Sequence, residues 1–571
     1  MTTSHPLMSP LRLPLCLLAI AGLAAGRGQA AEDAPAPDRF VELPPLMVAE
    51  QVNGPPWRYV EIPGLEVLSR CRDGTTLHLV EEMYRLQQLL AVMLPPDLQA
   101  KRAVPDTAVL YSEESKPVVA QEVVADLLRD GKDAGGESRR SSRGVGYRSM
   151  PNLRLTDRDA TSAFFILEEG GFAQAQLALT PDYIRYAIKS RTPSPPAWFV
   201  EGFVDLYDAG DFERNPITLS PVEWVSAAET KNLKRDPDYP RSLLPLAEFF
   251  SSPGPGADAA LWRGQAALFL RWAMEGDDHP RQPALWKFVA RASAEPVTEE
   301  VFRECFGLGY VDAQERMSDY LSNAVLGTLR LKPGKLAALP RLTPRPATDL
   351  EIARIKGDLE RLEIGWVKPR FPQLVPKYAE QARRTLMRAY DKGERDPRLQ
   401  AVIGLCECDA GNDAGARKFL EAAVQGGVVR PRASYELARL RYAEAQKAPD
   451  APGGRLSAAQ ATSVLQPLVT AWRQPPALLE MYALTADVWA RSVPAFTRKN
   501  LAMLDEGVAY FPRNAPLIYQ AAWLNARQGF KPEAEALIVR GLKVGTDPAF
   551  QTRFEQLRVN LAAMAQPAAA P

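Results

Sequence analysis

The chain has 571 residues, which at about 150 residues per domain is enough for three or four domains that each bury a core. Hydrophobic residues make up 46% and charged residues 24%, values that exclude a wholly disordered or fibrous protein. Basic and acidic residues number 69 each, so no net positive charge favours nucleic acid as a partner. The three histidines, His5, His78 and His279, are too far apart in the chain to form a local metal motif.

The first 30 residues have the pattern of a secretory signal peptide. Arg12 precedes an apolar run over residues 13–25, and the small residues Gly28 and Ala30 stand at the −3 and −1 positions of an expected cleavage site. We therefore expect an exported protein, periplasmic or extracellular, whose mature chain begins with a proline-rich linker over residues 31–54. No later stretch approaches about 18 uncharged apolar residues, which predicts no membrane span.

The region that follows the linker predicts strands mixed with a helix. Residues 59–62, 66–68 and 108–111 are short apolar runs typical of strands. Between Leu79 and Met93 the apolar residues recur about every 3.6 positions, which predicts a helix that ends before a pair of prolines. This part of the chain is therefore expected to be α+β.

The most informative motif comes in two segments, residues 179–186 and 196–207. The second segment contains Pro196, Trp198 and the dipeptide Glu201-Gly202. These residues resemble the peptidase MA-like branch of the gluzincin metallopeptidases. In that family one helix carries two zinc-binding histidines around a catalytic glutamate, and a second helix with Pro-x-Trp and Glu-Gly supplies the third zinc ligand. The resemblance, taken over residues 55–330, implies a strand-poor domain whose second part is mostly helical.

The first of the two helices departs from the family pattern. The two histidine positions hold Pro181 and Arg185, and the position of the catalytic glutamate holds Asp182, although Glu201 matches the third ligand. Zinc requires several neutral nitrogen, thiolate or carboxylate ligands, whereas proline cannot coordinate and arginine stays cationic. We therefore expect no catalytic residue, no metal and no cofactor in this domain, which we interpret as an inactive relative of the peptidases.

The exchange of histidine for arginine suggests what fills the place of the metal. We expect Arg185 to pair with both Glu201 and Asp182. The alternative is that Arg185 faces solvent and that Thr180 and Pro181 simply begin a helix with Asp182 near its positive end. In the first interpretation a pocket for a peptide or partner chain is lined by four residues: Asp182, Arg185, Trp198 and Glu201.

The last third of the chain predicts helical repeats. A proline-rich linker over residues 331–350 precedes an all-α region over residues 351–561. Its segments 397–430, 481–514 and 515–548 resemble tetratricopeptide repeats, which have a period of about 34 residues. We expect them to stack into a solenoid, with residues 351–395 as a capping unit and residues 562–571 as a disordered tail. An unspecialised helical bundle is the alternative.

Small residues at fixed positions support the repeats. Gly404, in the first helix of one unit, stands where two helices cross closely. Gly411 and Gly529 stand at the turns between helices, where the chain reverses.

The sequence as a whole favours an exported interaction scaffold over an enzyme. Its expected partner is a protein or peptide bound by the repeats. We find no nucleophile elbow, no phosphate-binding loop and no complete dinucleotide motif. The alternative is an active hydrolase, which either binds zinc through Asp182, Glu201 and a further carboxylate or uses no metal. A third possibility is that the peptidase-like domain is only a spacer, which deletion of residues 351–571 and an assay of partner capture would test.

Overall fold

A computed structural model of the chain describes most residues from 55 to 563. The described residues are 55–94, 103–112, 115, 152–167, 169, 181–211, 217–222, 224–236, 239, 242–256, 258–275, 280–331, 340–493, 496–544 and 547–563. The expected signal peptide, residues 31–54 and residues 564–571 lie outside this part of the chain. No described helix is both long enough and apolar enough to cross a membrane.

The N-terminal part is built on a six-stranded sheet with the order β4-β5-β3-β2-β1-β9. Its strands are β1 (Arg58–Ile62), β2 (Leu65–Arg70), β3 (Asp106–Ser112), β4 (Asn152–Thr156), β5 (Thr161–Leu167) and β9 (Arg345–Pro346). β2 is parallel to β3 and β3 to β5, and the other neighbouring strands are antiparallel. Helix α1 (Asp73–Met93) connects β2 to the part of the chain that forms β3. The three predicted strands and the predicted helix are present as β1, β2, β3 and α1.

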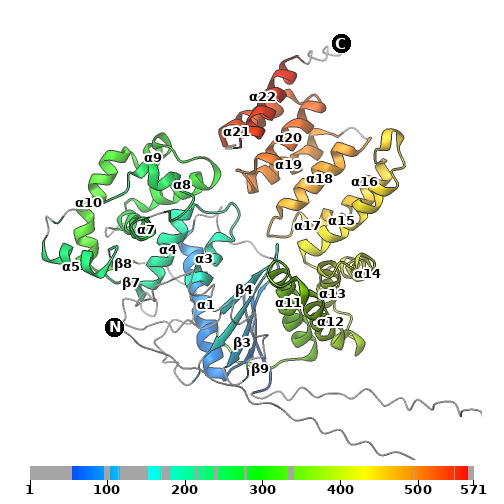
Figure 1. Cartoon of the computed structure of the whole chain (residues 1–571), viewed down its shortest axis with the longest axis horizontal. Helices are drawn as coiled ribbons and strands as arrows, with labels where there is room; N and C mark the ends of the chain where they lie inside the picture. The colour runs from blue at the N-terminus through cyan, green and yellow to red at the C-terminus, as the bar shows by residue number, and fades with distance from the viewer. Residues whose placement is uncertain are drawn as a thin grey trace, which may run out of the picture. The chain divides into compact units, whose positions relative to one another are not determined.

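Alternate side chains of the strands are buried on opposite faces of this sheet. One face, which includes Val60 and Val67, packs against α1. The other face, which includes Leu68 and Val109, packs against Ile355 and two leucines of α11 (Asp349–Val367). Figure 1 shows α1 and α11 on opposite sides of the sheet. Both faces are covered, as the parallel strands at the centre of a sheet require.

Helix α11 therefore joins the sheet to the helices that follow it. Its start is fixed by a capping box between Thr348 and Glu351. Arg354 donates two hydrogen bonds to Glu66 of β2, with Nη1 to Oε2 at 2.7 Å and Nη2 to Oε1 at 2.5 Å, and both side chains are buried. A deletion that begins at residue 351 would thus uncover one face of the sheet, so loss of partner capture after that deletion would have two explanations.

The second part of the N-terminal half is mostly helical. Its helices are α3 (Pro181–Lys189), α4 (Ala197–Asp208), α5 (Ala227–Arg235), α6 (Leu246–Ser251), α7 (Ala259–Met274), α8 (Gln282–Ala294), α9 (Glu299–Phe306) and α10 (Tyr310–Leu326). A small sheet joins β6 (Gly210–Asp211), β7 (Ile217–Leu219) and β8 (Leu329–Leu331). The buried side chains of these helices form one core with those of α1.

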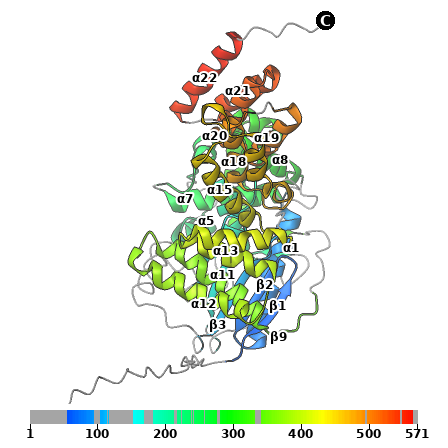
Figure 2. The same cartoon turned by 90° about the vertical axis from the view of Figure 1, so that its right-hand side faces the viewer.

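The remainder of the chain consists of helices in succession. These are α11, α12 (Val375–Asp391), α13 (Pro397–Asp409), α14 (Asp413–Gln425), α15 (Pro431–Lys447), α16 (Ala458–Leu465), α17 (Leu468–Ala471), α18 (Leu479–Arg491), α19 (Arg498–Tyr510), α20 (Ala515–Arg527), α21 (Lys531–Val544) and α22 (Pro548–Ala563), with the 3-10 turns η2 (Pro372–Leu374) and η3 (Pro452–Gly454). Neighbouring helices pack in pairs, α11 with α12, α13 with α14 and α20 with α21. In Figure 2 the helices from α11 to α22 follow one another away from the sheet.

The small residues singled out in the sequence lie where helices cross or turn. A Cβ atom added to Gly404 in α13 would lie 2.7 Å from Cγ of Leu420 in α14, so the two helices approach too closely for a larger residue. Gly411 and Gly529 have φ values of +80° and +83°, which only glycine adopts without strain. Each expected unit of the C-terminal half thus contains a pair of packed helices.

Candidate functional site

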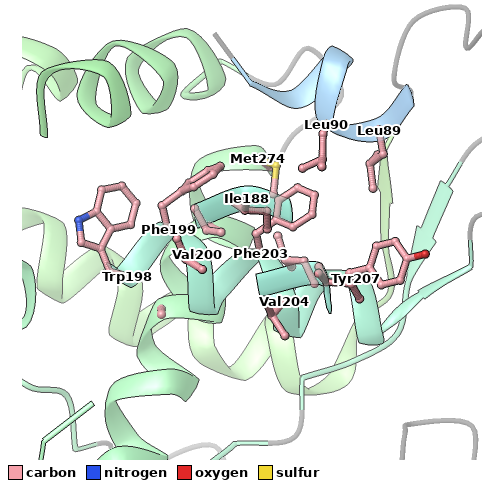
Figure 3. Close-up of a cluster of buried hydrophobic side chains, with 14 of the residues drawn as sticks. Leu89, Leu90, Ile188, Trp198, Phe199, Val200, Phe203, Val204, Tyr207 and Met274 are labelled. Atoms are coloured by element: carbon pink, nitrogen blue, oxygen red, sulfur yellow. The ribbon is translucent and has the colours of Figure 1, made fainter. Parts of the chain in front are cut away.

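Two neighbouring helices carry the residues of the sequence motif. Pro181 begins α3, where a missing N–H costs nothing and the fixed φ suits a helix, and Pro196 precedes the first residue of α4. Helix α4 is buried on nearly all sides. Figure 3 shows the apolar side chains that hold it: Phe199, Val200, Phe203, Val204 and Tyr207 of α4, Ile188 of α3, Leu89 and Leu90 of α1, and Met274 of α7.

The predicted pair of Arg185 and Glu201 is present. Nε of Arg185 donates to Oε1 of Glu201 at 2.5 Å, and Nη2 donates to Oε2 at 2.9 Å. This two-pronged geometry is the strongest that a guanidinium and a carboxylate can form. Nε of Arg263, from α7, lies 3.6 Å from the same Oε2. The Glu201 side chain is only 11% exposed, so its carboxylate is largely shielded from water beside these two arginines.

This arrangement does not suit zinc. Both oxygens of Glu201 accept hydrogen bonds from Arg185, whose guanidinium stays protonated at any physiological pH. Pro181 offers no ligand atom in its side chain. Within the described ranges, no group of three or more histidine, cysteine, aspartate or glutamate side chains gathers in a way that would hold a metal ion. The residues present at this site therefore do not fit the ligand set that the gluzincin resemblance implies.

The remaining residues of the predicted pocket are Asp182 and Trp198. Asp182 lies in α3, but its side chain is outside the described part of the structure, so its predicted pairing with Arg185 stays a prediction. The motif predicts Trp198 as a pocket residue, but the structure places it in the core, fully buried. Its ring stacks on Phe288 with centroids 5.4 Å apart and meets Phe250 edge-on at the same distance. Trp198 therefore packs the helices together instead of facing a ligand.

Gly202 has a packing role that is independent of any metal. A Cβ atom at this position would lie 2.6 Å from the backbone oxygen of Ala266 and 2.9 Å from Cδ1 of Leu270, both in α7. Helices α4 and α7 thus cross at a distance that only glycine permits. The dipeptide Glu201-Gly202 is explained here by one ion pair and one helix crossing.

A buried charge cluster, which sequence reasoning did not find, joins the sheet to the repeats. It consists of Asp157, Asp159, Asp358, Arg361, Asp409, Arg430 and Arg432. Asp157 and Asp159 lie in the β4–β5 turn, Asp358 and Arg361 in α11, and Asp409 at the end of α13. Arg430 directly precedes the first residue of α15, and Arg432 directly follows it. The only local signs of it are the patterns Asp-x-Asp at 157–159 and Arg-x-Arg at 430–432.

Arg361 is the centre of this buried charge cluster. Its side chain is 0% exposed and donates from Nε to Asp358 at 2.8 Å, from Nη1 to Asp409 at 2.8 Å and from Nη2 to Asp157 at 2.5 Å. Burial by itself raises the pKa of the Asp157 carboxyl, but Arg361, Arg432 and Arg430 outweigh burial and hold this pKa well below its usual range. The carboxylate is therefore charged and fully committed to its arginines.

A cavity of about 420 Å³ lies beside this cluster, and we call it the sheet–repeat cavity. It is lined by residues 156–161 of the β4–β5 turn, by Tyr186 of α3 and residues 190–192 after it, by residues 472–477 between α17 and α18, and by Tyr510 of α19. Tyr186 is the neighbour in sequence of Arg185, so α3 contributes both to the ion pair with Glu201 and to this cavity. Sequence reasoning did not find the cavity, because its walls come from four distant segments.

Three comparisons with known proteins were made, and one of them found a similar solved structure. No protein-family model and no curated protein matches the chain. Among solved structures, the crystal structure of a thermophilic TPR protein from Thermus thermophilus is similar at 17% sequence identity. The similarity covers 35% of this chain and 99% of that chain, with a TM-score of 0.24. So low a score carries no argument, and the repeat interpretation rests on the packed helix pairs and the glycine positions described above.

Proposed function

We propose that the protein is an exported, non-catalytic binding scaffold. In this proposal a domain related to the gluzincin peptidases has lost its zinc site, and a tetratricopeptide-like array presents a surface to a protein or peptide partner. The observation that carries the proposal is the Arg185–Glu201 pair, in which a permanent cation occupies both oxygens of the one carboxylate that matches a zinc ligand.

The packing of the repeats supports a role in binding. Stacked helix pairs offer an extended surface and no chemistry of their own. Their first helix, α11, is held to the sheet by apolar contacts and by the buried Arg354–Glu66 pair. The buried charge cluster adds a second attachment. An array held in this way keeps its surface ordered before a partner arrives, which lowers the entropy lost on binding.

Metal content tests the proposal against the hydrolase alternative. The mature protein, residues 31–571, is dialysed against micromolar zinc and then buffer, and bound metal is measured by mass spectrometry. We expect well under one zinc per chain in the wild type and no change in Glu201→Gln. The matched control is Glu248→Gln, which removes an exposed carboxylate on α6.

Two outcomes would contradict the proposal. One tightly held zinc per chain that is lost in Glu201→Gln but kept in Glu248→Gln would place a metal at this site. Hydrolysis of a peptide substrate that is abolished by Glu201→Gln would do the same for catalysis. A third variant, Arg185→Ala, removes the two hydrogen bonds of Arg185 to Glu201 and leaves Arg263 beside the carboxylate, and we expect it to bind no zinc because the chain still lacks the two histidines.

A further inference from the structure

The sheet–repeat cavity has the size and construction of a ligand site. Its volume of about 420 Å³ falls within the range of about 300–1,000 Å³ that is usual for pockets that bind small ligands. One wall contains residues of the buried charge cluster, and the backbone oxygen of Pro475 on another wall accepts a hydrogen bond from the N–H of Ala103 at 2.8 Å. These attachments give the cavity ordered walls.

The carboxylates that line the sheet–repeat cavity are already neutralised. Oδ1 of Asp159 accepts from Nε of Arg430 at 3.1 Å, and its Oδ2 accepts from the backbone N–H of Arg432 at 2.8 Å. Oδ2 of Asp157 accepts from Arg361 at 2.5 Å and from Arg430 at 3.3 Å. None of these three arginines lines the cavity, so they neutralise its acidic wall from behind.

One of the cations that line the cavity forms no ion pair with an acidic residue in the described part of the chain. Arg158 contacts Glu436 at 3.4 Å and Glu480 at 3.1 Å, so its charge is balanced. Arg473 is exposed and forms no ion pair with any residue in the described ranges. The positive charge of Arg473 therefore remains for a ligand, which favours an anion.

The remaining walls offer flat apolar surfaces. The rings of Tyr186, Trp472 and Tyr510 and the prolines at 475 and 476 line the same cavity. Aromatic and proline rings bind a planar or apolar group, which a bare inorganic anion does not possess. A guanidinium fork is matched in shape by a carboxylate.

We propose that the sheet–repeat cavity binds a carboxylate that is attached to a flat apolar group, with Arg473 as its cationic partner. Such a group occurs in a free aryl carboxylate and in an acidic residue beside an aromatic one within a peptide. The inference deepens the proposed function by naming a ligand class. It does not depend on the Arg185–Glu201 pair, so its failure and the failure of the metal test are distinguishable.

Calorimetric titration of the mature chain tests the proposal with two pairs of probes. The peptide pair is N-acetyl-Asp-Phe-amide and its neutral counterpart N-acetyl-Asn-Phe-amide, and the small-molecule pair is phenylacetate and phenylacetamide. We expect at least one acid to bind about tenfold more tightly than its amide, because a charged hydrogen bond to a guanidinium is lost in the amide. Binding of the peptide acid alone identifies a peptide ligand, and binding of phenylacetate alone identifies a free small molecule.

Variants of exposed cations show whether the cavity is responsible. Arg473→Gln removes an exposed charge, so it is expected to fold and to weaken the acid about tenfold without changing the amide. The control is Lys368→Gln, which removes an exposed cation from a different cavity of about 580 Å³, and we expect it to change nothing. The proposal is overturned if no probe binds, if acid and amide bind equally, or if the two variants have the same effect.

Discussion

Removal of Arg361 is expected to destabilise the whole molecule, because this side chain holds the sheet and the repeats together. The buried charge cluster contains four aspartates and three arginines. Without Arg361, the two remaining arginines face four carboxylates, of which those of Asp157, Asp159 and Asp358 are buried. Breaking one buried ion pair costs about 3–5 kcal/mol, since the partner is left charged and poorly solvated. We expect Arg361→Met, which keeps the length of the side chain, to lose a free energy of unfolding in this range.

A second variant separates charge from geometry. Arg361→Lys keeps the positive charge, but one ammonium cannot reach Asp157, Asp358 and Asp409 as the three nitrogens of the guanidinium do. We expect the free energy of unfolding of Arg361→Lys to lie between that of Arg361→Met and that of the wild type. This order of stabilities would indicate that both the charge and the shape of the guanidinium stabilise the cluster.

Urea unfolding followed by circular dichroism and by tryptophan fluorescence measures these losses. For Arg361→Met we expect the midpoint to fall by about 1–2 M urea. The control is Arg384→Met in α12, which removes a side chain 75% exposed with one contact to Glu380 and should cost less than about 0.5 kcal/mol. If the free energies of unfolding of Arg361→Met and Arg384→Met differed by less than about 1 kcal/mol, the cluster would not hold the sheet to the repeats.

Two further predictions concern packing and pH. Gly202→Ala places a Cβ atom 2.6 Å from the backbone oxygen of Ala266, so we expect a loss of about 1–3 kcal/mol and a lower melting temperature, whereas Gly365→Ala, with nothing within 4 Å, should be neutral or slightly stabilising. Equal effects of the two substitutions would contradict the close crossing of α4 and α7. Burial and the neighbouring Glu360 raise the pKa of Glu363 from 4.5 to about 8, so its protonated form stabilises the fold fully below pH 4.5, and this contribution is lost as the pH rises through 8. Between pH 5 and pH 9, we expect the free energy of unfolding to fall by about 1–3 kcal/mol less in Glu363→Gln than in the wild type. If the two proteins lost the same free energy of unfolding over this pH range, Glu363 would not titrate in this way.

Local patterns in the sequence predicted the elements whose signals are local. Strands β1, β2 and β3 and helix α1 follow from apolar alternation and from the period of their buried residues. Strand β5 was not predicted, although residues 161–167 have the β-branched and aromatic residues typical of a strand. Strand β9 has two residues and no such signal, because only its pairing with β1 defines it.

The motif at α3 and α4 led to one correct prediction and one wrong prediction. It placed Arg185 against Glu201 correctly, because each lies at a fixed position on one of two adjoining helices. It placed Trp198 in a pocket, whereas the indole is in the core, since the inward face of α4 is set by α7 and α8 packing around it. The sequence motif thus identified the helix pair but not the side of α4 that its neighbours cover.

The buried charge cluster and the sheet–repeat cavity were decided by the tertiary structure alone. Asp157 and Arg430 meet at 3.3 Å although 273 residues separate them, and Tyr186 and Tyr510 line one cavity from helices far apart in the chain. Periodicity fixes which face of a helix or strand is buried, because that depends on residues a few positions apart. Which faces then meet depends on the packing of α11 on the sheet and of the repeats on one another, and no spacing in the sequence records that choice.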